Sequence, residues 1–147
     1  PRVGAVVADV WEQLPIRTGS VHALAVVFAP RNPAEFARVL ADSGEAVMLV
    51  ADTGHLDELR EPLGILGVED GKIERLIAQS EGHLAPAADP ELIEFPMQLG
   101  RDAIAAQVGM SPSARHLDPA VLRDRLARLP EQMAVTARAR LIRMRKA

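Results

Sequence analysis

Three nearly continuous apolar runs of strand length dominate the first third of the chain. They are residues 5–10 (AVVADV), 23–30 (ALAVVFAP) and 45–52 (EAVMLVAD). A strand with one face in water alternates apolar and polar residues, whereas continuous runs are typical of parallel strands covered on both faces. The pattern therefore predicts three strands of a largely parallel sheet.

The segment between the second and third runs carries the signals of a helix. Asn32 is a good N-cap, Pro33 suits the first helical position, and Glu35 completes a capping box. Gly44 supplies a stop signal. The apolar residues that share one helical face are Phe36, Val39 and Leu40. A strand, a helix and a strand in this order predict a βαβ unit with a right-handed crossover.

Downstream segments continue the alternation of helices and strands. We expect helices at 55–66 (kinked or ended near Pro62), 70–80, 101–110 and 118–129, and strands at 91–99 and 134–147. Asp118 as N-cap and Pro119 at the first helical position mark the start of the last of these helices. Residues 82–90 are predicted to form a loop and residues 111–116 a polar turn. The order predicts an α/β fold with a doubly wound sheet, and we expect residues 1–147 to form a single domain.

Composition narrows the class of protein. The 147 residues are 48% apolar and 25% charged, which is ordinary for a soluble globular domain. No apolar run approaches the roughly 20 residues of a membrane span, and no secretory signal is present, so we expect a cytoplasmic protein with no membrane contact. The chain has no cysteine, and its four histidines lack metal-ligand spacing, so we assign no metal to it.

The charge is distributed unevenly along the chain. Residues 1–100 hold 7 basic and 16 acidic side chains, whereas residues 101–147 hold 10 basic and 4 acidic ones. A basic end on an acidic body can indicate contact with a polyanion. It is equally compatible with two complementary surfaces inside one fold.

Polar and aromatic residues follow the ends of the predicted strands, where open α/β sheets bind their ligands. After the first strand, the Asp9 carboxylate can accept from the exocyclic amine of an adenine, the next backbone N–H can donate to its ring nitrogen, and Trp11 can stack on it. The alternative is that Asp9 caps the following turn and Trp11 is half-buried packing. Both readings stay open at this point.

The other two strand ends carry weaker signals. Phe28, Ala29 and Pro30 form a rigid apolar lip against which a planar base can stack, or they are simply a strand ending at proline. His55 can hydrogen-bond a ligand carboxylate or hydroxyl, or it is a surface histidine near a helix N-terminus. No glycine-rich dinucleotide fingerprint and no Walker loop occur, so phosphate cradling within this chain is not expected.

Taken together, these motifs resemble class I S-adenosylmethionine (SAM) methyltransferases. More narrowly, the chain is similar to the 23S rRNA guanine-N1 methyltransferases, a family that includes a tylosin-resistance enzyme. The narrower resemblance is carried by FAP followed by AEFARVL, by GHLDELRE, by FPMQL, and by VGMSPSARH with LDP behind it. It runs over nearly the whole chain, and it leaves open whether this protein confers antibiotic resistance.

The resemblance implies a role for each motif. The residues implied to line the adenine pocket of SAM are Asp9, Val10 and Trp11, and His55 is implied to contact the cofactor. Those implied to hold the target base or to lie near the substrate are Phe28, Ala29, Pro30, Met110, Ser111, Pro112 and Arg115. The implied reaction is in-line methyl transfer to N1 of an unpaired or flipped-out guanine in a 23S rRNA hairpin, with no residue assigned as the base. The arginines expected to meet RNA phosphates are Arg115, Arg123, Arg125, Arg128, Arg138 and Arg140.

The chain also departs from the family. Members normally begin with a cysteine-based zinc module that recognises RNA, followed by a glycine-rich SAM loop and an acidic ribose-binding strand. None of these is in the sequence, so we expect the chain to be the C-terminal part of such an enzyme, from the third strand onward, with zinc only in the absent module. Some relatives carry a basic residue where this chain has Gly54. Two alternative functions remain open, a small-molecule methyltransferase and a non-catalytic α/β module. A homodimer also remains open as the oligomeric state.

Overall fold

A computed structural model describes residues 3–147, apart from the side chain of Pro112. The chain divides into two compact units. The first comprises Pro1–Val50, Gly71–Glu91 and Arg140–Ala147, and the second comprises Ala51–Asp70 and Leu92–Ala139. Whether the two units form one domain stays a prediction.

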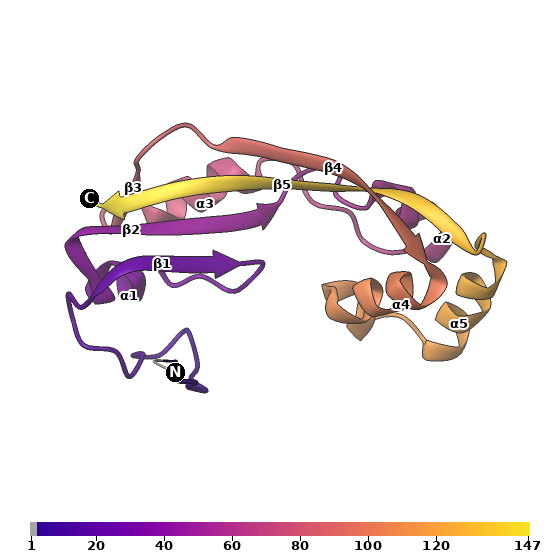
Figure 1. The fold of residues 1–147 in the computed structure, drawn as a ribbon, viewed down its shortest axis with the longest axis horizontal. Coiled ribbons are helices and arrows are strands. Elements are labelled where there is room, and N and C mark those ends of the chain that lie inside the picture. The colour runs from indigo at the N-terminus through magenta and orange to yellow at the C-terminus, as the bar shows by residue number, and fades with distance from the viewer. Residues whose placement is uncertain (1–2) are drawn as a thin grey trace. The chain divides into compact units, whose positions relative to one another are not determined.

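The βαβ unit predicted from the sequence lies in the first unit (Figure 1). Strand β1 (Val21–Val27) pairs in parallel with β2 (Leu40–Ala51), and helix α1 (Pro33–Val39) connects them. Asn32 caps α1, because its side-chain oxygen accepts from the Glu35 N–H at 3.2 Å. The Glu35 carboxylate does not complete the capping box, since it turns instead to Arg38 and to the Leu14 N–H.

Gly44 is not the helix stop that the sequence predicts. Helix α1 ends at Val39, and Gly44 lies inside β2. A Cβ atom at Gly44 would lie 2.7 Å from the Val21 carbonyl oxygen and 3.0 Å from that of Ala41. The pairing of β1 with β2 also shifts register between Val21 and Ala23. Glycine is therefore needed for the close approach of two backbones at a strand irregularity.

The strand predicted at residues 5–10 does not form. Residues 3–9 have no regular structure, a turn begins at Val10, and the side chains of Val6 and Val7 are 69% and 104% exposed. A fully apolar strand is stable when a neighbouring strand pairs with it and other layers cover it. Within the described residues, no strand pairs with this run and only Val10 of it packs against the core of the first unit, so its apolar composition alone does not make it a strand.

The open sheet is mixed rather than wholly parallel. Its order is β1-β2-β5-β3, with β4 (Glu91–Gly100) pairing with β5 (Gln132–Lys146). The arrows of β2 and β5 point in opposite directions in Figure 1, and β3 (Leu84–Pro86) is antiparallel to β5. The predicted strands at 91–99 and 134–147 are confirmed, while β3 lies within the segment 82–90 that was predicted to be a loop. The α/β class is confirmed.

Apolar side chains from helices and strands build the core of the first unit. Helix α3 (Lys72–Ser80) is amphipathic, as its sequence predicts, and it buries Ile73 and Leu76. The other fully buried or nearly buried apolar members include Phe36, Leu40, Met48, Val50, Leu84, Ile142 and Met144. Leu84 explains why the short strand β3 forms, because its side chain is buried in this core.

The second unit surrounds a separate core. Its helices are α2 (Arg60–Leu63), preceded by the 3₁₀ turn η1 (Asp57–Leu59), α4 (Arg101–Met110) and α5 (Pro119–Arg128). Its buried apolar residues are Leu59, Leu63, Ile104, Val108, Leu129 and Val135. The predicted cap of α5 is confirmed, since the Ala120 N–H donates to the Asp118 carboxylate at 2.7 Å. No helix in the described part of the chain has the length and apolarity of a membrane span.

Candidate cofactor and nucleotide site

The turn at Asp9–Trp11 uses its polar groups internally. The Trp11 N–H donates to Asp9 Oδ1 at 2.9 Å, and the Glu12 N–H donates to the Asp9 carbonyl at 3.2 Å. This is the turn-capping geometry of an Asx turn. Asp9 is exposed and Trp11 is 65% exposed. The carboxylate keeps its second oxygen for an exocyclic amine, and the predicted adenine contact stays a prediction.

Asn32 fixes the position of this turn. Its side-chain nitrogen donates to the Val10 carbonyl at 3.1 Å, while its side-chain oxygen caps α1. One side chain thus ties the turn to the start of a helix. The sequence identified Asn32 as a cap, but its contact with Val10 spans 22 residues and has no local signal.

A partly buried ion pair on α1 holds the segment that follows the turn. Glu35 accepts from Arg38 Nε at 2.8 Å and from the Leu14 N–H at 2.7 Å. Arg38 also donates to the carbonyls of Leu14 and Ile16. The hydrogen bond from Arg38, opposed by burial and aided by Leu14, lowers the pKa of Glu35 below its ordinary 4.5. Residues 14–16 are therefore anchored by a side-chain network.

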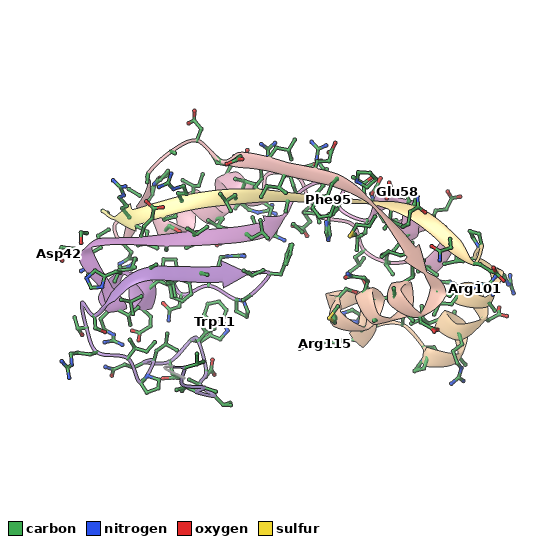
Figure 2. All side chains as sticks on the ribbon, viewed as in Figure 1. Trp11, Asp42, Glu58, Phe95, Arg101 and Arg115 are labelled. Carbon is green, nitrogen blue, oxygen red and sulfur yellow. The ribbon has the colours of Figure 1, made fainter. Side chains whose placement is uncertain are left out.

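A cavity of about 140 Å³ joins two of the sequence-predicted motifs. Trp11 from the first motif and Pro30 from the second both line it, and Arg31 lies between Pro30 and α1. The remaining lining residues are Pro33, Leu76, Gln79 and Ser80. The three from α3 are contributions that the sequence analysis missed, because only tertiary packing brings them to this place. Figure 2 labels Trp11 on the N-terminal segment.

Of the side chains that the structure describes, Arg31 is the one charged group that lines the cavity. It is partly buried, and burial lowers its pKa. Within the described residues, its guanidinium has no hydrogen bond or ion pair. Ser80 is already used, since its hydroxyl donates to the Leu76 carbonyl at 2.8 Å. Arg31 and the exposed Gln79 amide are thus the polar groups that remain available here.

The FAP motif directs its residues to different places. Phe28 has a φ of 47°, and its N–H donates to the Leu49 carbonyl at 2.9 Å. Its ring is 56% exposed, whereas Ala29 packs against the core of the first unit and Pro30 reaches the cavity. A left-handed conformation costs a residue with a side chain about 1–2 kcal/mol, and such strain is concentrated at functional sites. The predicted apolar lip stays a prediction.

His55 belongs to the second unit. Its Nδ1 accepts from the Arg138 N–H at 3.0 Å, so in this arrangement the ring proton is on Nε2. Gly54, which precedes it, has a φ of 90°, and Leu56, which follows it, has a φ of 56°. The glycine at position 54 is explained by this backbone, which a residue with a side chain rarely adopts. The predicted contact of His55 with a cofactor stays a prediction.

The predicted substrate segment also lies in the second unit. Met110 is 75% exposed, and the Ser111 hydroxyl donates to the Val108 carbonyl at 2.7 Å. Arg115 is exposed (Figure 2) and makes no hydrogen bond or ion pair within the described residues. The side chain of Pro112 lies outside the described residues. Ser113 anchors the segment, because its buried hydroxyl accepts from the Leu66 N–H at 3.0 Å.

Most of the arginines expected to meet RNA already have a hydrogen-bond or ion-pair partner within the chain. Arg125 donates to the Leu63 carbonyl at 2.6 Å, and Arg128 pairs with Asp124 at 2.5 Å. Arg138 pairs with Glu94 and lies 3.7 Å from the Asp52 carboxylate, and Arg140 also has a partner. Like Arg115, Arg123 is exposed and makes no such contact in the described part of the chain. These two remain the clearest candidates for phosphate contact.

The overall sequence of the chain is similar to the same proteins that its motifs resemble. No protein-family model matches the chain. It is 42% identical over 145 residues to a Micromonospora griseorubida protein named "Putative 23S rRNA (guanine-N(1)-)-methyltransferase", covering 99% of this chain and 49% of that protein. It is 40% identical over 136 residues to the 23S rRNA (guanine(748)-N(1))-methyltransferase of Streptomyces fradiae, covering 92% and 48%.

A solved structure is also similar to part of the chain. It is the YcgJ protein of Bacillus subtilis, at 15% identity and a TM-score of 0.48, covering 91% of this chain and 67% of that one. The chain spans about half the length of the curated relatives it matches. Over nearly its whole length, this chain is similar in sequence to proteins named as 23S rRNA (guanine-N1)-methyltransferases.

Proposed function

We propose that the complete protein transfers a methyl group from SAM to N1 of a guanine in 23S rRNA. The observation that carries this proposal is the 40–42% identity to proteins with that name over 92–99% of the chain. Because the chain spans about half of those relatives, the activity is proposed for the complete protein. A cytoplasmic location follows from an rRNA substrate.

The described residues fit one end of SAM. Asp9, Val10 and Trp11 would hold the adenine, with one oxygen of Asp9 still available to its amine. His55 is proposed as a further contact. When bound, SAM supplies a methyl group activated by its positively charged sulfur.

On the substrate side, the FAP motif is proposed to present the target base. The edge of a guanine that carries N1 is blocked by base pairing, so the base must be unpaired or flipped out. The exposed ring of Phe28, held by its backbone hydrogen bond to Leu49, offers a face for stacking. Positioning then supplies much of the rate acceleration. The guanine N1–H must lose its proton, and no described residue is assigned to accept it.

RNA contact is proposed for Arg115 and Arg123, together with Met110, Ser111 and Pro112 near the substrate. In the described part of the chain, no group of three or more His, Cys, Asp or Glu side chains could hold a metal ion. As the family resemblance implies, zinc is proposed only for a cysteine-based module of the complete protein.

Methylation of a 23S rRNA hairpin by the complete protein tests the proposal. We expect incorporation of methyl groups from SAM, a stop of reverse transcription at one guanine, and loss of the stop when that guanine is replaced. Activity on a small molecule that persists at high salt, with none on the hairpin, would support a small-molecule methyltransferase instead. Absence of S-adenosylhomocysteine binding would support a non-catalytic module.

A further inference from the structure

We propose that the cavity between Trp11 and Arg31 binds one 5′-phosphorylated nucleotide of the RNA substrate, apart from the guanine that is methylated. The proposal rests on the proposed function and deepens it by naming a second RNA subsite. It concerns the first unit only, where Trp11, Arg31 and the α3 residue Gln79 line the same cavity.

The cavity combines the groups that recognise a nucleotide. Trp11 offers an indole, on which any base can stack, and Pro30 and Leu76 supply apolar walls. Gln79 is exposed, and its amide can both donate to and accept from a base edge. Arg31 supplies a planar guanidinium, whose fork of N–H groups matches a phosphate.

Arg31 is the residue that favours an anion. The Arg31 guanidinium is partly buried and, within the described residues, has no hydrogen bond or ion pair, so it is open to an anionic partner. Among the described residues, no acidic side chain that could pair with Arg31 lines the cavity. A bound phosphate would provide the missing charge. The contact does not depend on a glycine-rich loop, whose absence from the sequence therefore does not exclude it.

The adenine of SAM suits this cavity less well than a nucleotide does. The base and ribose of SAM carry no anionic group to pair with Arg31. The Asp9 carboxylate, which would recognise adenine, does not line the cavity, and one of its oxygens is bound to the Trp11 N–H. Trp11 has two ring faces, so it can wall the cofactor on one face and the cavity on the other.

Trp11 is the only tryptophan of the 147 residues, so its fluorescence reports directly on the cavity. We would titrate the chain with guanosine 5′-monophosphate, guanosine and inorganic phosphate. We expect saturable quenching by the monophosphate at about tenfold lower concentration than by guanosine, because the phosphate adds a charge-assisted pair. Inorganic phosphate alone should not quench.

Variants at position 31 test the role of the guanidinium. Arg31→Gln should remove the preference for the monophosphate, and Arg31→Lys should keep part of it. Arg17→Gln, which removes an exposed guanidinium from the same unit, should change nothing. Equal quenching by guanosine and its monophosphate, or an unchanged preference in Arg31→Gln, would overturn the proposal. Competitive displacement of the monophosphate by S-adenosylhomocysteine would also overturn it, by assigning the cavity to the cofactor.

The complete protein separates this inference from the proposed function. There, Arg31→Gln should raise the KM for the rRNA hairpin about tenfold and leave the KM for SAM unchanged. Unaltered KM values in Arg31→Gln would contradict the subsite while methyl transfer stands. A wild-type protein that binds the monophosphate but methylates no RNA would contradict the proposed function alone.

Discussion

The side-chain amide of Asn32 donates to the carbonyl of Val10 at 3.1 Å, and its oxygen caps α1 at the same time. This joins the turn that carries Trp11 to the helix that follows the FAP motif. The Asn32 side chain therefore helps to hold the candidate cofactor turn in place. Two substitutions at this position can distinguish its contact with Val10 from its capping of α1.

Asn32→Asp should keep the cap and lose the contact with Val10, because a carboxylate accepts but does not donate. We expect its stability to stay close to wild type, while Trp11 becomes more accessible to a collisional quencher of fluorescence. Asn32→Ala should lose both functions and destabilise the protein by about 0.5–2 kcal/mol. Equal quencher access in Asn32→Asp and the wild type would show that the amide does not hold the turn.

Acidification should weaken the anchor of residues 14–16. The pKa of Glu35 is lowered in the folded state by Arg38, so its stabilising contribution is present above its ordinary pKa of 4.5 and is lost as the pH falls through the lowered value. Chemical denaturation across this range should show a falling free energy of unfolding. Glu35→Gln should flatten the dependence and cost about 1–3 kcal/mol at neutral pH, since it leaves Arg38 partly unpaired.

In Glu35→Gln, the free energy of unfolding should still depend on pH, because a second carboxylate contributes. Glu45 on β2 accepts from Arg143 at 2.6 Å and pairs with Arg145 at 3.2 Å. These contacts, Arg143 foremost, lower the pKa of Glu45, so its contribution has the same sign. A pH dependence that is identical in the wild type and in Glu35→Gln would contradict the role assigned to Glu35.

Two glycines should respond in opposite directions to alanine. Gly44→Ala places a methyl group 2.7 Å from the Val21 carbonyl oxygen, which should destabilise the protein by about 1–3 kcal/mol. Gly109→Ala in α4 meets no atom within 4 Å and should stabilise the protein by up to about 1 kcal/mol. Thermal unfolding of both variants measures the difference. A neutral Gly44→Ala would show that β1 and β2 are not so closely apposed.

His55→Asn tests the predicted cofactor contact without removing the internal acceptor. An asparagine oxygen can still accept from the Arg138 N–H, so the fold should be retained. If His55 also contacts SAM, the complete protein with this substitution should bind S-adenosylhomocysteine about tenfold more weakly, equivalent to about 1.4 kcal/mol. Unchanged affinity, measured by calorimetry, would restrict His55 to a structural role.

Arginines in the second unit should separate into two classes. Arg115→Gln and Arg123→Gln should weaken binding of the rRNA hairpin and reduce its dependence on salt, since exposed arginines that meet phosphates release counterions. Arg125→Gln should lower the stability, because its guanidinium donates to the Leu63 carbonyl. Filter binding at several salt concentrations, paired with thermal unfolding, distinguishes the two. The same salt dependence in all three variants would contradict the assignment.

Local signals in the sequence predicted the elements whose causes are local. The caps at Asn32 and Asp118 and the amphipathic pattern of α3 depend on residues a few positions apart, and all three are confirmed. The strand at 5–10 was wrong because its apolar residues would require neighbours that they do not have here. Gly44 was misread because the same residue serves a helix end and a close strand contact.

The candidate site was predictable only in part. The rule that ligands bind at the ends of strands pointed to Trp11 and Pro30, which do line one cavity. No local pattern indicates that α3 brings Gln79 to that cavity, because Gln79 is 68 residues away from Trp11 and only tertiary packing brings the two together. The internal use of Arg125 and Arg138 was likewise hidden, since their partners are far away in the sequence.

The most direct test is the modification state of 23S rRNA in cells that express the complete protein. Mass spectrometry of rRNA fragments should find one additional methyl group on one guanine, at N1, where it blocks base pairing. The methyl group should be absent from the rRNA of cells that lack the protein. This single modified guanine is the result expected from the proposed function. Unmodified 23S rRNA in expressing cells, from a protein that is folded and binds S-adenosylhomocysteine, would contradict it.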